Sequence, residues 1–335
     1  MGENYDELLR GPPLARYRAL VDLVGLDTEE AEAKAARAAM EGAPELAPLF
    51  AEVCAWPGTV LASHKSASQG FHRLSFLAEL GVSAEHPSVA SALGAILVGM
   101  DDDGMPRLPT AYDGRFGGPG EAKAAWALCD APVTLKSLAL FGLSGHEKVR
   151  AGAATVLSLV RANAWPCALS PELSSFRPPG RKADPCPYAT LVCLELVAAL
   201  EEGGGEEYGG LKAGPEAAAG VEALLLAWER SRDWHPYMFY AGNDFRKLKA
   251  PCLWYDILHV ADALSHFPLA LGDPRFEEMM ASIESKADAD GRFVPESVYK
   301  PYAAWDFGQK KSPSPWLGFL VARMRKRRAI AAAGS

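Results

Sequence analysis

The segment KAPCLWYDILHVADAL, residues 249–264, places a thiol, a carboxylate and an imidazole close together. Cys252, Asp256 and His259 are spaced i, i+4 and i+7, so they share one face if the segment is helical. A carboxylate and an imidazole on one face can act as general acid and base, and with the thiol they also form a zinc half-site. The alternative is that His259 is a hydrogen-bonded histidine of a helical core. The segment therefore predicts acid–base chemistry or, as an alternative, zinc binding.

Thiols recur at corresponding places along the chain. Cys129, Cys186 and Cys252 each follow a lysine by at most seven residues, near the expected first turn of a helix. A helix N-terminus stabilises a thiolate and lowers the pKa of the thiol. The alternative is that cysteine packs there as a small apolar residue. The candidate catalytic residues are therefore Asp256, His259, Cys252, Cys129, the adjacent Asp130, and His72, which aligns with Asp256.

These residues belong to an internal repeat. Four segments align on a lysine, KSASQGFHRLSFLAEL, KADPCPYATLVCLELVAAL, KAPCLWYDILHVADAL and KSPSPWLGFLVARM, and KAAWALCDAPVTLKSLALFGL is a looser fifth copy. Successive lysines lie 58, 59, 67 and 62 positions apart, and the longest interval contains the glycine-rich insertion EEGGGEEYGGLKAG. A constant period of this size is typical of stacked supersecondary units.

Each unit contains two predicted helices. The first follows the lysine, and the second lies in residues 88–100, 147–162, 216–231 or 274–287, where apolar residues recur at helical spacing. A polar turn then leads back to the next lysine. Residues 14–26 and 27–42 predict an N-terminal helix pair, the second capped by Asp27 or Thr28 and stopped by Gly42. Alternation typical of hairpin strands is absent, so we expect an all-α fold.

The repeats resemble those of the terpenoid cyclase and protein prenyltransferase superfamily. The resemblance rests on residues 254–296, which end in the turn DADGRF, and on DDDGMP, and it extends loosely over residues 65–325. It implies an α/α toroid of about five to six hairpins, with parallel inner helices around a central cavity. Phe293 and Met105 replace the usual tryptophan, and the usual glutamine is missing. Neither the cyclase motif Asp-x-Asp-Asp nor the zinc-ligand spacing of the prenyltransferases is present, so the family's chemistry is not carried over.

In such a toroid the repeat lysines would surround one mouth. Each inner helix adds roughly half a positive charge at its N-terminus, so the mouth would attract an anionic ligand. Aromatic side chains in the same regions would give it apolar walls. The alternative is that the lysines are solvated loop residues and the aromatics fill the core. The candidate substrate-binding residues are Lys65, Lys123, Lys182, Lys249, Lys311, Tyr188, Trp254 and Tyr255.

Bulk composition restricts the class of protein. The chain has 335 residues and a net charge of −8, which argues against a dedicated nucleic-acid binder. No export signal, no membrane-spanning apolar run and no CxxC pair is visible in the sequence, so we expect a soluble cytoplasmic protein with free thiols. The basic run at residues 323–328 suits a helix C-terminus, with nucleic-acid binding as the alternative.

These observations predict one domain, in which helices of residues 1–60 pack on or complete a toroid of residues 61–328. The predicted function is that of a small-molecule enzyme that binds an anionic, partly apolar substrate at the lysine-rich mouth. Isomerisation, lyase-type elimination or prenyl-diphosphate chemistry would each fit. The alternative is a non-catalytic binding or scaffold protein for an anionic ligand, a peptide or a nucleic-acid end.

Overall fold

The computed structural model describes residues 5–118, 120–173 and 175–334. Helices dominate this part of the chain, which confirms the predicted all-α class. The expectation of no strands is wrong in one place. Strands β1 (Leu108–Thr110) and β2 (Lys123–Ala125) pair antiparallel, with Leu108 opposite Ala125. Lys123 therefore lies in a strand and not in a loop that leads into a helix.

The first helix of each predicted unit begins between four and eight residues after its lysine. These helices are α5 (Gly70–Leu80), α7 (Ala131–Leu138), α9 (Pro187–Gly203), α11 (Ile257–Leu264) and α14 (Pro315–Gly334). Proline occupies the first position of α9 and α14, where its fixed φ suits a helix and its missing N–H would have no intrahelical partner. The side chains of α9 are buried on nearly every face, so α9 lies in the interior.

The second helices also form where the apolar spacing predicts them. They are α6 (Pro87–Gly99), α8 (Glu147–Ser158), α10 (Pro215–Glu229) and α13 (Pro274–Glu284). Each buries one stripe only; α8, for example, buries Val149, Gly152, Ala153 and Val156. The remaining α-helices are α1 (Asp6–Leu9), α2 (Pro13–Arg18), α3 (Ala31–Glu41), α4 (Leu46–Cys54) and α12 (Pro268–Leu271).

Shorter helical turns complete the chain. Two are π-helical, Ala19–Val24 and Ala139–Leu143, and continue α2 and α7 respectively. The 3-10 turns are Gly114–Phe116, Pro171–Leu173, Gly205–Tyr208, Leu211–Ala213, Pro236–Met238, Lys300–Tyr302 and Asp306–Gly308. The predicted N-terminal pair is present as α2 with its π-helical extension, and α3. Helix α3 starts at Ala31 and not beside Asp27, because the Asp27 carboxylate accepts the N–H of Glu29 in a local turn.

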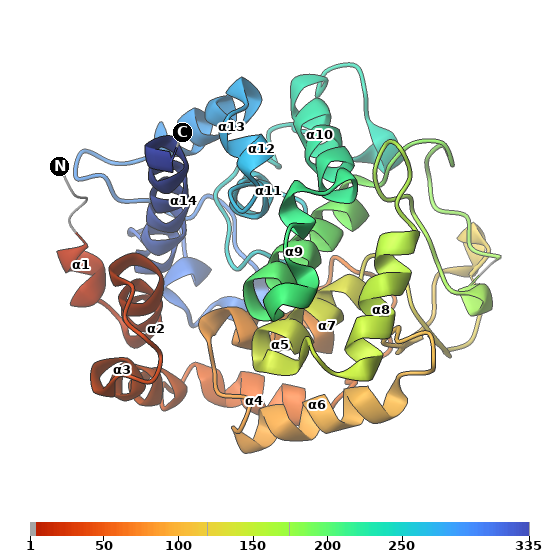
Figure 1. Cartoon of the computed structure of the whole chain (residues 1–335), viewed down its shortest axis with the longest axis horizontal. Coiled ribbons are helices and arrows are strands. Elements are labelled where there is room, and N and C mark those ends of the chain that lie inside the picture. The colour runs from red at the N-terminus through yellow and green to blue at the C-terminus, as the bar shows by residue number, and fades with distance from the viewer. Residues whose placement is uncertain (1–4, 119, 174, 335) are drawn as a thin grey trace.

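Neighbouring first helices pack against one another in sequence order. Helix α5 packs on α7, α7 on α9, α9 on α11, and α11 on α14, which in turn contacts α2 and its π-helical extension. Tyr17 and Arg18 of α2 then lie against Gly81, directly after α5. In Figure 1, α5, α7, α9 and α11 lie toward the middle of the molecule, and α3, α6, α8, α10 and α13 lie toward its outside. One apolar core runs from Leu14 to Met324.

The predicted helix over residues 249–264 is wrong in its first half. Helix α11 begins at Ile257, Asp256 is its N-cap residue, and Cys252 lies in the preceding loop. Asp256 sets this boundary, because its backbone is extended and its carboxylate caps the helix by accepting the N–H of His259. Cys252, Asp256 and His259 therefore do not share a helical face. Within the described ranges, no helix is long and apolar enough to cross a membrane.

Candidate functional site

An imidazole–carboxylate pair lies where the loop before α5 meets the start of α7. The Nε2–H of His64 donates to Oδ2 of Asp130 at 2.7 Å, and the Tyr112 hydroxyl lies 3.4 Å from the same nitrogen. Asp130 is 1% exposed, and burial raises the pKa of its carboxyl, although the His64 hydrogen bond opposes this. Among the described residues, Nδ1 of His64 has no hydrogen-bond partner.

His72 holds the backbone of this pair in place. Its Nε2–H donates to the carbonyl of His64 at 2.7 Å. Burial lowers the pKa of His72 to about 3, so the ring is neutral at physiological pH. Sequence analysis predicted His72 as a catalytic residue, but this geometry makes it a positioning residue behind His64.

Three thiols gather beside the pair. Cys129 and Cys186 lie close enough for each to affect the pKa of the other, and Cys186 is the N-cap residue of α9, although its side chain makes no cap hydrogen bond to that helix. Cys129 lowers the pKa of Cys186, and burial opposes this shift. Cys167 is close enough to interact electrostatically with both, and burial raises its pKa to about 12.

The helix start is therefore not the main influence on these thiols: Cys129 is the largest cause of the lowered pKa of Cys186, and the pKa values of Cys129 and Cys252 are raised. The neighbouring Cys186, followed by burial, raises the pKa of Cys129. Burial raises the pKa of Cys252, which lies in a loop and receives no helix N–H groups.

Two of the five repeat lysines lie against aromatic rings. The Lys65 ammonium lies 5.5 Å from the centre of the Trp254 ring, and the Lys249 ammonium lies 3.5 Å from that of Tyr299. Both lysines help to lower the pKa of Asp244, although the hydrogen bond from Lys247 is the largest cause. Lys182 and Lys311 are exposed loop residues, and Lys123 is in β2 near Glu172. Within the described residues, those three lysines share no contact with Lys65 or Lys249.

The three candidate aromatic residues differ in their surroundings. Tyr188 is fully buried, stacks 4.1 Å from Trp254 and donates its hydroxyl to the Leu253 carbonyl at 2.9 Å. Tyr255 is buried between Phe239 and Phe245. Only Trp254 is partly exposed, so it alone can present an aromatic face to a ligand.

Asp256 and His259 have structural contacts that occupy most of their polar atoms. Oδ1 of Asp256 accepts the N–H of His259 at 3.0 Å and caps α11, and burial raises the pKa of Asp256 to about 6. Nδ1 of His259 lies 2.8 Å from the Trp254 carbonyl, and Nε2 lies 3.0 Å from Glu195. Burial lowers the pKa of His259, but Glu195 outweighs it and raises the pKa to about 9. His259 is therefore a buried imidazolium paired with Glu195.

The proposed zinc half-site is not formed. Cys252 is off the helix, and Asp256 and His259 are engaged as just described. Among the residues that the structure describes, no three His, Cys, Asp or Glu side chains converge so as to hold a metal ion.

A buried charge network extends from His259 into the middle of the molecule. The Lys136 ammonium is 2.7 Å from Glu79 and 3.0 Å from Glu195, and Lys136 is 4% exposed. Burial alone would raise the pKa of Glu195, but Lys136 and His259 lower it to about 2. Sequence reasoning missed this network, His64, Tyr112 and Cys167. A usable signal was present in VTLKSLALF and LVCLELVAAL, where one charge interrupts an apolar run.

The network reaches a cavity of about 630 Å³ at the C-terminal side of α5, α7, α9 and α11. Charged side chains in its wall form ion pairs with one another. Asp262, for example, pairs with Arg323 at 2.6 Å and with Arg327 at 2.9 Å. Arg325 and Arg328 pair with Glu284. The basic run of α14 thus forms ion pairs within the protein.

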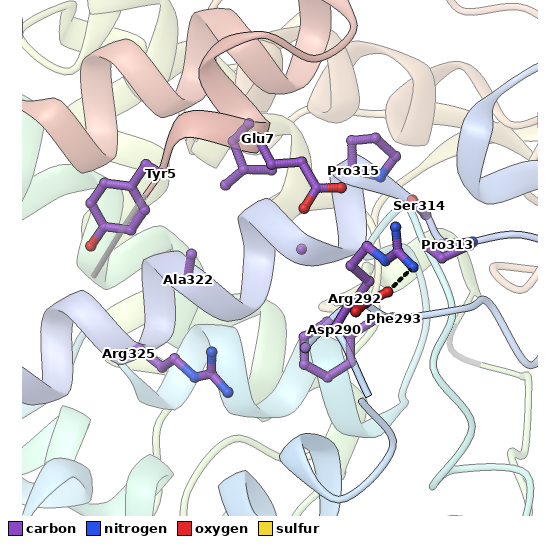
Figure 2. A pocket seen from close by; sticks show the side chains of 13 residues that line it. Tyr5, Glu7, Asp290, Arg292, Phe293, Pro313, Ser314, Pro315, Ala322 and Arg325 are labelled. Atoms are coloured by element: carbon purple, nitrogen blue, oxygen red, sulfur yellow. Dashed lines mark hydrogen bonds and ion pairs between the residues drawn. The ribbon is translucent and has the colours of Figure 1, made fainter. Parts of the chain in front are cut away.

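A second hollow, of about 470 Å³, lies between α1, α14 and the turn at residues 290–293 (Figure 2). Arg292 in its wall pairs with Asp290 of the same turn. None of the predicted catalytic or binding residues lines this hollow. It is therefore separate from the His64–Asp130 pair.

Comparison with known proteins does not place the chain in a family. No protein-family model matches the sequence, and no curated protein is detectably similar to it.

Proposed function

We propose that this protein is a small-molecule enzyme in which His64 and Asp130 perform general acid–base catalysis on an anionic, partly apolar substrate. The hydrogen bond of 2.7 Å between His64 and the buried Asp130 is the observation that carries the proposal. It orients the ring, assigns the hydrogen to Nε2 and leaves Nδ1 as the proton acceptor. A buried carboxylate also stabilises the imidazolium that forms when Nδ1 takes a proton.

The fold that we propose is an α/α toroid related to the terpenoid cyclases and prenyltransferases. Its inner ring would consist of α5, α7, α9, α11, α14 and α2. Support comes from the order in which these helices pack, each on the next, and from the contact of Tyr17 and Arg18 with Gly81, which returns the series to α5. In this arrangement His64, Asp130, Cys186 and Asp256 all lie at the N-terminal ends of inner helices.

The substrate class follows from the neighbours of His64. Lys65 is the next residue, and Lys249 shares its electrostatic environment around Asp244. Two ammonium groups near several helix N-termini favour the binding of an anion such as a diphosphate or carboxylate. The exposed part of Trp254 offers an apolar surface beside them. Proton transfer to or from such a substrate gives isomerisation or elimination, and an allylic diphosphate is the substrate that we would test first.

The binding test uses thermal shift at low salt with pyrophosphate and farnesyl diphosphate. A ligand at a hundredfold excess over Kd stabilises the native state by about 2.7 kcal/mol. We expect the increase in Tm to be lost in Lys65→Ala/Lys249→Ala and kept in Lys182→Ala/Lys311→Ala, the matched control with two exposed lysines. Equal loss in both variants would contradict a specific site at Lys65 and Lys249.

The catalytic test compares turnover of the bound diphosphate between the wild type and two variants. Turnover is measured as pyrophosphate release and as deuterium uptake from D₂O. His64→Gln and Asp130→Asn should keep binding and lower turnover by about 10²–10⁴-fold, the usual contribution of a positioned acid or base. Binding without turnover in the wild type would instead support the non-catalytic binding protein.

A further inference from the structure

The cavity at the C-terminal side of α5, α7, α9 and α11 holds charges that the proposed acid–base chemistry does not use. Four arginines line it, and we call them the arginine cluster: Arg18 of α2, Arg37 of α3, and Arg323 and Arg327 of α14. Among the described residues that line this cavity, none is a candidate catalytic or substrate-binding residue. The cluster is therefore separate from His64 and from Lys65 and Lys249.

The arginine cluster carries more positive charge than its acidic partners balance. Arg18 pairs with Asp22 at 2.7 Å. The two arginines of α14 share Asp262, at 2.6 and 2.9 Å. Within the part of the chain that the structure describes, Arg37 has neither an ion pair nor a hydrogen bond from its side chain. Four guanidinium groups thus face two carboxylates, which leaves two positive charges without a partner.

Several N–H groups of the cluster also lack an acceptor in the protein. Nη1 of Arg18 and both Nε and Nη2 of Arg327 make no hydrogen bond among the described residues, and none of these nitrogens is buried. Nη1 of Arg18 lies beside Gly81, which also lines the cavity. A guanidinium presents its donors in a planar fork that fits carboxylate and phosphate oxygens. These donors therefore suit an anionic ligand.

The arginines are not needed to compensate the helix ends at this cavity. In the last turn of α5, two carbonyls accept the N–H groups of Gly81 and Val82. In the last turn of α11, two carbonyls accept the N–H groups of Ser265 and His266. The backbone thus satisfies carbonyls that a cation would otherwise have to compensate, and the remaining donors of the cluster are left for a ligand.

The other charged side chains of the wall limit the charge of that ligand. Lys136 is held between Glu79 and Glu195, at 2.7 and 3.0 Å, and Glu202 contacts His266 at 2.7 Å. These carboxylates would repel an anion that carries more charge than the arginine cluster neutralises. A ligand with two negative charges meets this condition, and a diphosphate does not.

We propose that the arginine cluster binds a small dianion, a phosphate group or a dicarboxylate, in this cavity. The two charges of such a ligand equal the two that the cluster leaves without a partner. The volume of about 630 Å³ is within the range of small-molecule sites. This site does not depend on the acid–base function proposed for His64.

The test measures the binding of inorganic phosphate, succinate and pyrophosphate by isothermal titration calorimetry at constant ionic strength. Lys65→Ala/Lys249→Ala is the background for every measurement, because those lysines are themselves proposed to bind an anion. We expect phosphate or succinate to bind more tightly than pyrophosphate. Tighter binding of phosphate assigns the site to a phosphate group, and tighter binding of succinate assigns it to a dicarboxylate.

Arg37→Gln is the sharpest variant, because Arg37 has no partner whose loss would affect the fold. It should raise Kd by at least about tenfold, as expected when a charge-assisted hydrogen bond is lost. Arg16→Gln changes the net charge equally and is the matched control, since Arg16 is exposed on α2 and is not a lining residue of this cavity. Three results would overturn the proposal: no binding of phosphate or succinate, equal weakening by the two variants, or tightest binding of pyrophosphate.

Discussion

Two aspartates at corresponding places have different roles in this protein. Asp130 and Asp256 directly precede α7 and α11, the first helices of their repeat units. Asp256 turns its side chain to the helix and accepts the N–H of His259, whereas Asp130 directs its carboxylate across to His64. The first contact stabilises a helix, and the second orients a titratable ring. Which of these two roles an aspartate before a helix takes depends on the side chain that lies opposite it in the fold.

The burial of Asp256 gives a prediction for the pH dependence of stability. Its pKa is raised from 3.8 to about 6, because burial penalises the carboxylate and Oδ2 has no hydrogen-bond partner within the described residues. Because its folded-state pKa is raised, Asp256 contributes most to the stability of the folded state below pH 3.8. This contribution is lost as the pH rises through 6. Asp256→Asn removes the titration. Relative to the wild type, the variant should therefore gain about 3 kcal/mol between pH 4 and 7.

Urea unfolding at several pH values measures this difference, and Asp273→Asn is the matched control. Asp273 caps α13 in the same way, but its hydrogen bonds with Arg275 lower its pKa. A lowered pKa contributes stability above pH 3.8 that is lost only as the pH falls through the folded-state pKa, so the difference between this control and the wild type should stay constant between about pH 4 and 7. Parallel trends in the two variants would contradict the role of burial at Asp256.

The site was predictable from the sequence only where residue type and repeat position were sufficient. The repeat selected four of these residues, Cys129, Asp130, Lys65 and Lys249. The structure places each of them in the candidate site or beside it. His64 was missed although it precedes Lys65, because nothing local indicates that it faces a carboxylate 66 residues away. Tyr112 and Cys167 lie outside the repeated segments, so a search for periodicity could not select them.

At the scale of the elements, apolar spacing predicted where helices lie, and local capping contacts and proline decided where they begin. The second helix of each unit starts within one residue of its predicted position. Helix α11 starts late because Asp256 caps it, and α3 because Asp27 forms a turn of its own. The strands β1 and β2 were not predicted, since three residues are too few to show alternation.

One contact between elements makes a sharp prediction. A side chain on Gly152 of α8 would place Cβ 2.2 Å from the Gly104 carbonyl oxygen and 2.9 Å from Leu135. Gly104 has a φ of 68° in the turn after α6, so that backbone cannot easily yield. Gly152→Ala should destabilise the protein by about 1–3 kcal/mol, the usual cost of overpacking.

Gly94 provides the matched control for this substitution. It lies on the exposed side of α6, where an added Cβ would meet nothing within 4 Å. Gly94→Ala should stabilise the protein by about 0.5–1 kcal/mol, because alanine loses less backbone entropy in a helix. Urea unfolding measures the change in the free energy of unfolding for both variants. We expect the two changes to have opposite signs. Stabilisation by both would show that α8 can move away from the turn.

At the scale of the whole molecule, the two ends of the chain meet. Lys326 of α14 donates to the carbonyls of Asp22 and Leu23 at 2.8 and 3.2 Å, about 300 residues away in sequence. These carbonyls lie near the end of the π-helical extension of α2, where a cation compensates unpaired backbone acceptors. Arg323 of α14 pairs with Asp262, which lies in the second half of α11. Helix α14 thus joins the last repeat to the N-terminal pair.

This closure distinguishes a compact molecule from an open solenoid in solution. A compact chain of 335 residues should have a radius of gyration of about 20 Å. The same hairpins stacked in an open array would have a larger radius, because α14 and α2 would then be at opposite ends. Small-angle X-ray scattering on the dilute monomer measures the radius directly. A value near 20 Å is expected from the contacts of Lys326, and a markedly larger one would contradict both the closure and the proposed single mouth, since the N-terminal ends of the inner helices would then lie along a groove.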